Sequence, residues 1–292
     1  MKQPNYLNYH LKLYCLRRFF LFLLPVFFYA GLNAQTVRLP LVSSYPGMGA
    51  YSKNYVDAFS MVVNPAALAS LKQGGAGVYG ERRFLLSALT QYTAVAGIAS
   101  NSGNFGLQAD YFGYTNYNET QLGLAYGRSL GKKVDVGVKF NYYNLRIPSY
   151  TTSSAFHFEA GVVMHLSEQL HAGFSVFNPV GGVLNKETNE KIASVYRGGL
   201  GYEVSDKFLI TAEIIKEESK DLGVNAAFQY EIVNQLLIRG GINTINPQPF
   251  IGVGLRLGQL RIDAATSWHP QLGATPAVMM VLDFKKKQQA AE

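Results

Sequence analysis

Cysteine and charged residues are scarce in this sequence, and each shortage excludes a class of protein. One cysteine in 292 residues excludes a fold held together by disulfide bonds. Charged residues make up 15% and aromatic residues 13%, which excludes a disordered chain, because disordered chains are rich in charge and poor in aromatics. Beyond residue 34, no apolar run approaches the roughly 18 residues that a membrane-spanning helix needs. The abundant residues are instead glycine (29), tyrosine (19) and phenylalanine (18), a composition that fits strands with one apolar and one polar face.

The first 34 residues have the pattern of a secretory signal peptide. Four basic residues precede an apolar run over 19–28, and the small residue Ala34 follows a few positions later. We expect cleavage after Ala34, because the apolar run is shorter than the roughly 20 residues of a retained anchor. The segment 1–34 carries four bases and no acid, so its loss lowers the net charge from +7 to +3. A nucleic-acid partner is therefore not expected.

The remaining chain alternates between apolar and polar residues with a period of two. In the segment 134–142, every second residue from Val134 to Tyr142 is apolar, and Asp135, Gly137, Lys139 and Asn141 lie between them. The segment 222–231 repeats this design. Fourteen such segments predict fourteen strands, at 75–83, 88–100, 104–114, 119–129, 134–146, 154–165, 169–178, 194–204, 208–217, 221–232, 235–244, 249–258, 259–269 and 275–285.

Short connections alternate with mostly longer ones along these strands. This alternation is typical of an outer-membrane barrel, which has short periplasmic turns and longer outer loops. Only helices and closed barrels satisfy all their backbone hydrogen bonds inside a bilayer. We therefore predict an all-β fold, a 14-stranded antiparallel transmembrane barrel over 74–285, followed by a basic periplasmic tail over 286–292. The alternative is a soluble β-sandwich or barrel, which would carry rows of charge on its polar faces rather than the glycine, alanine and asparagine found here.

Residues 35–73 do not alternate, and we expect them to form a short helical hatch inside the barrel. Asn64 has a side chain that can cap a helix, and Pro65 suits the first helical turn, where no amide donor is needed. A barrel of fourteen strands is wide enough to leave space in its lumen. A compact N-terminal segment would fill that space.

The motifs in this segment resemble those of a known family. Gly47-Met48-Gly49-Ala50, Asp57-Ala58 and 64–69 (Asn-Pro-Ala-Ala-Leu-Ala) are similar to the N-terminal signature of the FadL-type (long-chain fatty-acid transporter) superfamily. More narrowly, they resemble the PorV and PorQ proteins of the Bacteroidetes type IX secretion system, although Ala67 stands where that pattern usually has glycine. The resemblance implies a hatch in the lumen that includes Asp57, Asn64, Pro65 and Ala66. It also implies either passage of hydrophobic substrates or a partner role in protein export.

Charged residues on the polar faces should point into the lumen. We expect them to pair with one another or to hold the hatch, because an unpaired charge in a confined space is costly. An ion path is the alternative, but a balance of both signs argues against a selective pore. The predicted lumen charges are Asp135, Lys139, Arg197, Glu203, Glu213, Glu231, Arg239, Arg256, Arg261 and Asp263.

Three other motifs are weak signals for a nucleotide site, a metal site or a catalytic site. The Gly75–Gly80 segment matches G-x-G-x-x-G, but no helix is expected after it, so nucleotide binding is disfavoured. His165 and His171 flank a short turn and could approach each other, yet nothing around them has metal-ligand spacing. Asp263, Ser267 and His269 share one face of a predicted strand, which allows a hydrolase hypothesis. We expect neither an enzyme, a metal nor a cofactor.

The sequence therefore predicts an exported outer-membrane barrel. Its expected function is that of a PorV/PorQ-like, type IX secretion-associated component that binds secretion-machinery or cargo proteins. The alternative is a FadL-like channel that takes up hydrophobic small molecules, and an outer-membrane hydrolase is a third, weaker hypothesis. Besides these partners, outer-membrane lipid would surround the apolar face. An apolar pocket between hatch and wall, with a strand kink that opens sideways, would favour the channel.

Overall fold

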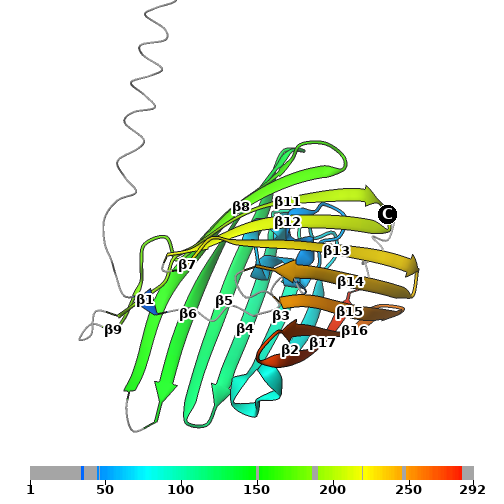
Figure 1. Ribbon diagram of the computed structural model, residues 1–292. Helices are drawn as coiled ribbons and strands as arrows, with labels where there is room; N and C mark the ends of the chain where they lie inside the picture. The colour runs from blue at the N-terminus through cyan, green and yellow to red at the C-terminus, as the bar shows by residue number, and fades with distance from the viewer. Residues whose placement is uncertain are drawn as a thin grey trace, which may run out of the picture. The chain divides into compact units, whose positions relative to one another are not determined.

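Fourteen antiparallel strands close into one barrel in the computed structural model (Figure 1). The structure describes residues 34–35, 45, 47–148, 151–185, 190–218, 220–244 and 248–284. The last barrel strand pairs with the first, Asp283 opposite Gly75, and this pairing closes the wall. The barrel strands are β2 (Gly75–Arg82), β3 (Thr90–Ile98), β4 (Asn104–Tyr114), β5 (Tyr117–Leu130), β6 (Val134–Ile147), β7 (Thr151–His165), β8 (Leu170–Phe177), β11 (Val195–Ser205), β12 (Phe208–Glu217), β13 (Gly223–Val233), β14 (Leu236–Asn243), β15 (Gln248–Leu257), β16 (Leu260–His269) and β17 (Gly273–Asp283).

The predicted fold class is confirmed, since each of the fourteen predicted segments is a barrel strand. The bounds of β4 and β12 agree with the predicted 104–114 and 208–217. The predicted strand 88–100 begins later, at Thr90, because two 3-10 turns, η5 (Arg83–Leu85) and η6 (Ser87–Leu89), occupy the connection after β2. In the described part of the chain, no helix is long and apolar enough to cross a membrane.

The two rims of the barrel differ in their connections. We call one rim the turn end, where short turns follow β3, β5, β7, β11, β13 and β15, and the opposite rim the loop end. The sequence predicted mostly longer connections at the loop end. One of them is short, because Thr115 and Asn116 alone join β4 to β5. The longest loop-end connection, between β8 and β11, contains two short strands that the sequence analysis missed, β9 (Val183–Asn185) and β10 (Glu190–Ile192). A third, β1 (Ala34–Gln35), pairs in parallel with β10.

The wall is apolar outside and polar inside. On β6, Phe140 is 65% exposed on the outer surface, whereas its neighbours Lys139 and Asn141 are each 1% exposed. The same alternation places Val278, Met280 and Leu282 of the last strand on the outer surface, together with Phe284 directly after it. This arrangement inverts that of a soluble protein and is typical of a barrel whose outer face meets lipid.

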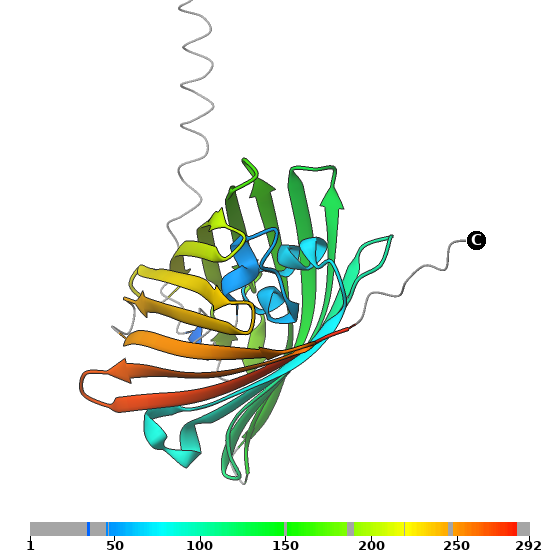
Figure 2. The same ribbon diagram turned by 90° about the vertical axis from the view of Figure 1, so that its right-hand side faces the viewer.

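The N-terminal segment lies inside the barrel. Figure 2 shows it in blue and light blue, enclosed by the strands. We define the plug as Tyr45 together with residues 47–73; its three 3-10 turns are η2 (Met48–Tyr51), η3 (Ala58–Val62) and η4 (Pro65–Ser70). The predicted signal peptide, except Ala34, and the predicted tail 286–292 lie outside the described residues, as do 36–44 and 46 of the predicted hatch.

Candidate functional site

The hatch motif shapes the turns of the plug. Asp57 caps η3: its Oδ1 accepts from the backbone N–H of Phe59 at 3.0 Å, and the hydroxyl oxygen of Ser60 accepts from the backbone N–H of Asp57. Asn64 caps η4 in the same way, through its Oδ1 and the N–H of Ala66 at 3.0 Å, with Pro65 at the first position of the turn. These contacts explain why a short polar residue begins each turn.

Asn64 also fastens the plug to the wall. Its Nδ2 donates to the carbonyl oxygens of Val162 in β7 at 3.2 Å and Phe174 in β8 at 3.4 Å. From the opposite direction, the Nδ2 of Asn104 in β4 donates to the carbonyl oxygens of Leu68 at 2.6 Å and Leu71 at 3.0 Å. The open carbonyl groups at the end of η4 are thus satisfied by the wall.

A ring of inward-facing glycines forms the seat of the plug. At each of them, an added Cβ would lie closer than 3.0 Å to a plug atom, so a larger residue would require that atom to move. At Gly137, for example, the clash would be with the backbone of Pro65 and Ala66, which cannot rotate away. The ring spans β2 to β8, β11 and β15, and consists of Gly77, Gly97, Gly106, Gly127, Gly137, Gly161, Gly173, Gly199, Gly201 and Gly252.

An arginine cluster holds the plug at the turn end. The guanidinium of Arg261 lies 2.8 Å from Oδ2 of Asp57 in the plug and 3.2 Å from Oδ2 of Asp263 in its own strand. Arg239 lies 3.7 Å from the same oxygen of Asp263 and donates to the carbonyl of Tyr45 at 3.1 Å. Burial raises the pKa of the Tyr45 phenol to about 12, so this phenol stays neutral. The guanidinium of Arg239 lies over its ring.

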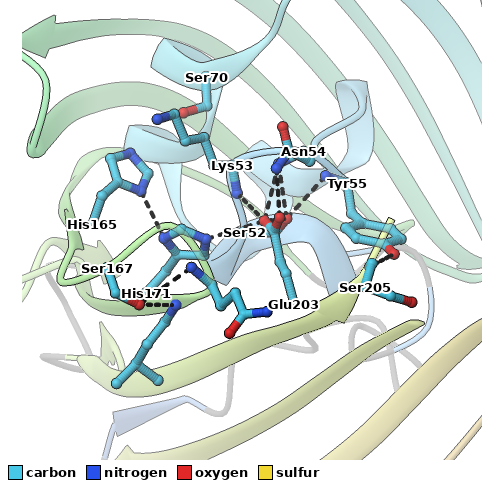
Figure 3. Close-up of polar contacts among 12 residues, drawn as sticks. Ser52, Lys53, Asn54, Tyr55, Ser70, His165, Ser167, His171, Glu203 and Ser205 are labelled. Atoms are coloured by element: carbon cyan, nitrogen blue, oxygen red, sulfur yellow. Dashed lines mark hydrogen bonds and ion pairs between the residues drawn. The ribbon is translucent and has the colours of Figure 1, made fainter. Parts of the chain in front are cut away.

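A single carboxylate, Glu203 in β11, holds the plug segment 52–54 (Figure 3). Its Oε1 accepts from the hydroxyl of Ser52 at 2.6 Å and from the backbone N–H groups of Lys53 at 2.7 Å and Asn54 at 3.0 Å. Its Oε2 accepts from the side-chain amide of Asn54 at 2.6 Å. Four donors converge on one charged group, and charge-assisted hydrogen bonds are the strong ones.

An ion pair in the wall also contacts the plug, at Tyr51. Arg197 and Glu213 lie 3.4 Å apart on neighbouring strands, and the hydroxyl of Tyr51 donates to Glu213 at 2.7 Å. Burial, together with the Glu213 carboxylate, holds the pKa of the Tyr51 phenol well above its usual value. Tyr51 therefore stays protonated and acts as a donor to the wall.

Lys139 lies in the lumen beside the plug and is almost fully buried. Its Nζ lies 2.9 Å from Oε1 of Glu159 and donates to Gln108 at 2.9 Å and to the carbonyl of Met61 in the plug at 3.4 Å. Among the remaining predicted lumen charges, Arg256 and Glu231 lie 2.9 Å apart at the turn end and are partly exposed. Asp135 is buried and lies 3.1 Å from Nε2 of His165.

The ten predicted lumen charges thus form separate clusters rather than one network. Sequence reasoning missed the partners that complete these clusters, notably Glu159 and Gln108, and a further group at the loop end, where Arg83 lies 2.9 Å from Glu81 and donates to Gln91 at 2.8 Å. Strand parity was the signal available for finding them. Glu159 falls on the inward positions of the predicted strand 154–165.

The structure contradicts the hydrolase hypothesis. Asp263 is engaged by Arg261 and Arg239, and the hydroxyl of Ser267 donates to Gln248 at 3.3 Å. Nδ1 of His269 accepts backbone N–H groups of its own loop. Equal parity along one strand spreads these side chains over its length, so a shared face does not bring them into contact.

The two histidines do approach each other, with 3.0 Å between their Nδ1 atoms. Within the described ranges, however, no group of three or more His, Cys, Asp or Glu side chains is arranged to hold a metal ion.

Two cavities lie on opposite sides of the plug. The larger, of about 430 Å³, opens at the turn end between plug residues 53–57 and 70–73 and the ends of the last strands. The smaller, of about 40 Å³, lies toward the loop end and is bordered by Val62, Val63, Gln108 and Lys139. A third hollow, of about 550 Å³ and mostly apolar, lies on the outer face of β3–β7, where small alanine side chains leave a depression in the surface. Gln108 borders this hollow as well.

Comparison with known proteins shows which solved structures this barrel resembles. Neither a protein-family model nor a curated protein matches the chain. Among solved structures, the CymD monoaromatic hydrocarbon channel matches with a TM-score of 0.60 and 10% identity over 84% of this chain and 97% of that one. A FadL homologue of Pseudomonas aeruginosa matches with a TM-score of 0.57 and 12% identity over 87% and 98%. The chain has the fold of the FadL-type barrels.

The toluene transporter TbuX of Ralstonia pickettii matches as well, with a TM-score of 0.54 and 11% identity over 87% of this chain and 98% of that one. The superfamily-level resemblance found in the sequence is therefore supported at the level of fold. None of these three proteins is a type IX secretion component, so the narrower resemblance to PorV and PorQ gains no support. The hydrocarbon channel and the toluene transporter are transport proteins.

Proposed function

We propose that this protein is an outer-membrane channel for small hydrophobic molecules, closed in this structure by its plug. The fold that it has in common with hydrocarbon channels and its apolar outer face support this function. The observation that carries it is the placement of two hollows back to back: the small cavity beside the plug and the apolar hollow outside the wall both border Gln108. Between lumen and lipid, the barrier at this point is one layer of hydrogen-bonded strands.

The wall shows no opening at this point. Residue-by-residue pairing continues from β3 through β7, and among the described barrel strands the ladders shift register only next to Glu203 and Glu231, both near the turn end. The cavity between plug and wall is lined by apolar side chains, such as Val62 and Phe177, together with charged ones, such as Lys139 and Glu159. Passage therefore requires movement of the plug, of this part of the wall, or of both.

A disulfide that locks the plug tests this requirement. The Cβ of Ala58 lies 3.8 Å from the position that a Cβ on Gly97 would take, which is the usual separation across a disulfide. The natural cysteine, Cys15, lies in the predicted leader, so Ala58→Cys/Gly97→Cys introduces one defined pair. Uptake of radiolabelled toluene is measured in a Gram-negative host that lacks its own hydrocarbon channels. We expect uptake to fall when the pair is oxidised and to return on reduction, while each single variant stays unaffected by oxidant.

One outcome would count against the channel itself, and another would count only against movement of the plug. If cells that express the wild-type barrel take up no more toluene or oleate than cells without it, the proposed function is wrong. If uptake is present but oxidation of the pair leaves it unchanged, the channel stands and plug movement does not.

The outer hollow makes a separate prediction. Ala94 faces outward in the hollow, and Ala94→Phe fills it. We expect a severalfold drop in uptake if molecules leave through this part of the wall. The matched control is Ala212→Phe, at another outward-facing alanine on β12 away from the hollow, which should leave uptake unchanged. Equal uptake in both variants would exclude this exit.

A second candidate function is a partner-binding barrel of the secretion-associated kind. The close fit of the plug and the two-residue β4–β5 connection favour it, because a sealed barrel with short loops gives little grip on a substrate. A deletion strain that retains exported proteins in its periplasm would support this role. Normal secretion in that strain would exclude it.

A further inference from the structure

The longest strands of the barrel extend beyond the apolar part of its outer face. β5, β6 and β7 have 14, 14 and 15 residues, whereas about 9–11 residues cross the hydrocarbon core of a bilayer. At the loop ends of these strands, the outward-facing side chains change from apolar to polar. Six of them lie in two rows of three paired residues, which we call the polar patch: Thr120, Asn144 and Ser154, then Asn118, Arg146 and Thr152.

The outer hollow begins directly below the polar patch. Leu122, Tyr142 and Phe156 form the next paired row toward the turn end, and all three border the hollow. From there the hollow crosses the outer face to Ala94 and Ala96 in β3. Its volume of about 550 Å³ falls in the range of about 300–1,000 Å³ that is typical of ligand pockets. An apolar slot that starts at a polar edge fits an amphiphile with a headgroup and an acyl chain.

The polar patch is suited to a phosphorylated sugar. The side-chain amide of Asn144 donates to the hydroxyl of Ser154 at 2.9 Å, and the hydroxyl of Tyr142 lies 3.1 Å from the same oxygen, so this part of the patch is held in place. Amide and hydroxyl groups both donate and accept, as the hydroxyls of a sugar do. Arg146 is exposed and gives the patch its positive charge, and a guanidinium binds phosphate oxygens through two parallel hydrogen bonds.

Packing and headgroup contacts decide which lipid occupies such a hollow. An acyl chain in a bilayer is already in an apolar environment, so it gains no free energy of transfer from water when it enters the hollow. It gains dispersion contacts with the surrounding side chains, which are individually small and collectively large. A basic residue near the membrane surface adds attraction for an anionic headgroup. The hollow therefore favours a chain whose headgroup reaches Arg146.

We propose that the polar patch and the outer hollow bind lipid A, the phosphorylated disaccharide lipid that anchors lipopolysaccharide in the outer leaflet. The longer connections of outer-membrane barrels face outward, which places the loop end in that leaflet. A phosphate binds Arg146, sugar hydroxyls bind Asn144 and its neighbours, and one acyl chain lies along the hollow toward Ala94. The inference goes beyond the proposed function, because a channel and a partner-binding barrel can both hold this lipid.

Lipid binding to the intact barrel in detergent tests the site. Native mass spectrometry counts the lipids that stay bound while the purified barrel is titrated with lipid A, phosphatidylglycerol or phosphatidylethanolamine. We expect one lipid A to bind about tenfold more tightly than either phospholipid, the effect of one or two additional hydrogen bonds to a charged group. The smaller phospholipid headgroups reach fewer of the six side chains.

One variant removes the charge of the patch. Arg146→Gln should weaken the binding of lipid A about fivefold, the effect of one basic residue beside an anionic lipid. The matched control is Arg128→Gln, at another exposed arginine on the outer face, near the turn end of the neighbouring strand β5. This control should bind lipid A like the wild type.

A second variant fills the hollow. Ala109 borders the hollow and faces outward, so Ala109→Phe should weaken lipid A binding severalfold, whereas Ala212→Phe on β12 should leave it unchanged. The proposal is overturned if lipid A binds no more tightly than phosphatidylethanolamine, or if either site variant binds it like its control. Equal affinity for phosphatidylglycerol would overturn the assignment to lipid A. Because binding is measured without uptake, a failure of the proposed channel function would leave this result unaffected.

Discussion

Gly201→Val is expected to displace the plug from its seat. A Cβ at this position would collide with the backbone carbonyl oxygen of Tyr51, and a backbone atom in a tight turn cannot rotate aside. Such overpacking costs about 1–3 kcal/mol, and the upper half of that range raises the displaced fraction about 30- to 150-fold. The same shift pulls the Tyr51 hydroxyl from Glu213. We expect faster hydrogen exchange across 47–73 and larger ion conductance in planar bilayers.

Gly198→Val provides the matched control on the same strand. Gly198 faces outward, and a Cβ there would meet nothing within 4 Å. Valine favours strands, so this variant should fold and conduct like the wild type. If Gly201→Val keeps the wild-type exchange and conductance of the plug, the glycine ring is not its seat.

Arg261→Leu is expected to lower the free energy of unfolding by about 3–5 kcal/mol, because it leaves buried acids without their partner. Asp57 loses its only ion pair among the described residues, and Asp263 keeps only Arg239 at 3.7 Å. The change is measured by urea unfolding of the barrel refolded in lipid vesicles. Asp57→Asn serves as the second arm of a double-mutant cycle, since asparagine caps a helix as well as aspartate does and removes only the charge. We expect the double variant to cost less than the two single variants together.

Arg256→Leu is the control at the same rim. Arg256 also pairs with an acid, Glu231, but its side chain is 36% exposed, so this pair should contribute no more than about 1 kcal/mol. Equal losses for Arg256→Leu and Arg261→Leu would show that the Asp57–Arg261 contact does not fasten the plug.

Local rules account for much of what could be predicted here. Alternation along 134–142 identified β6 and its two faces, because a strand turns every second side chain to the same side. Asn64 and Pro65 identified the start of η4, because capping depends on residues adjacent in the chain. By contrast, β9 and β10 are three residues long, and so short a strand shows no period.

Alternation along a strand showed which side chains share a face, but it did not show which of them are in contact. Asp263, Ser267 and His269 share a face, yet each bonds to different neighbours, because positions four and six residues apart on a strand are far apart in space. His165 and His171 were considered only as metal ligands. Their carboxylate neighbours, Asp135 and Glu203, come from two other strands.

The sequence by itself determined the number of barrel strands, the outward face of each and the caps of two plug turns. These features follow from the period of a strand and from neighbours in the chain. Only the tertiary structure decided which glycines seat the plug, which acid meets which base, and that two histidines face each other between two carboxylates. Such contacts depend on the register of closure, which brings residues more than 100 positions apart to within hydrogen-bonding distance, as with Ser52 and Glu203. No local pattern carries that register.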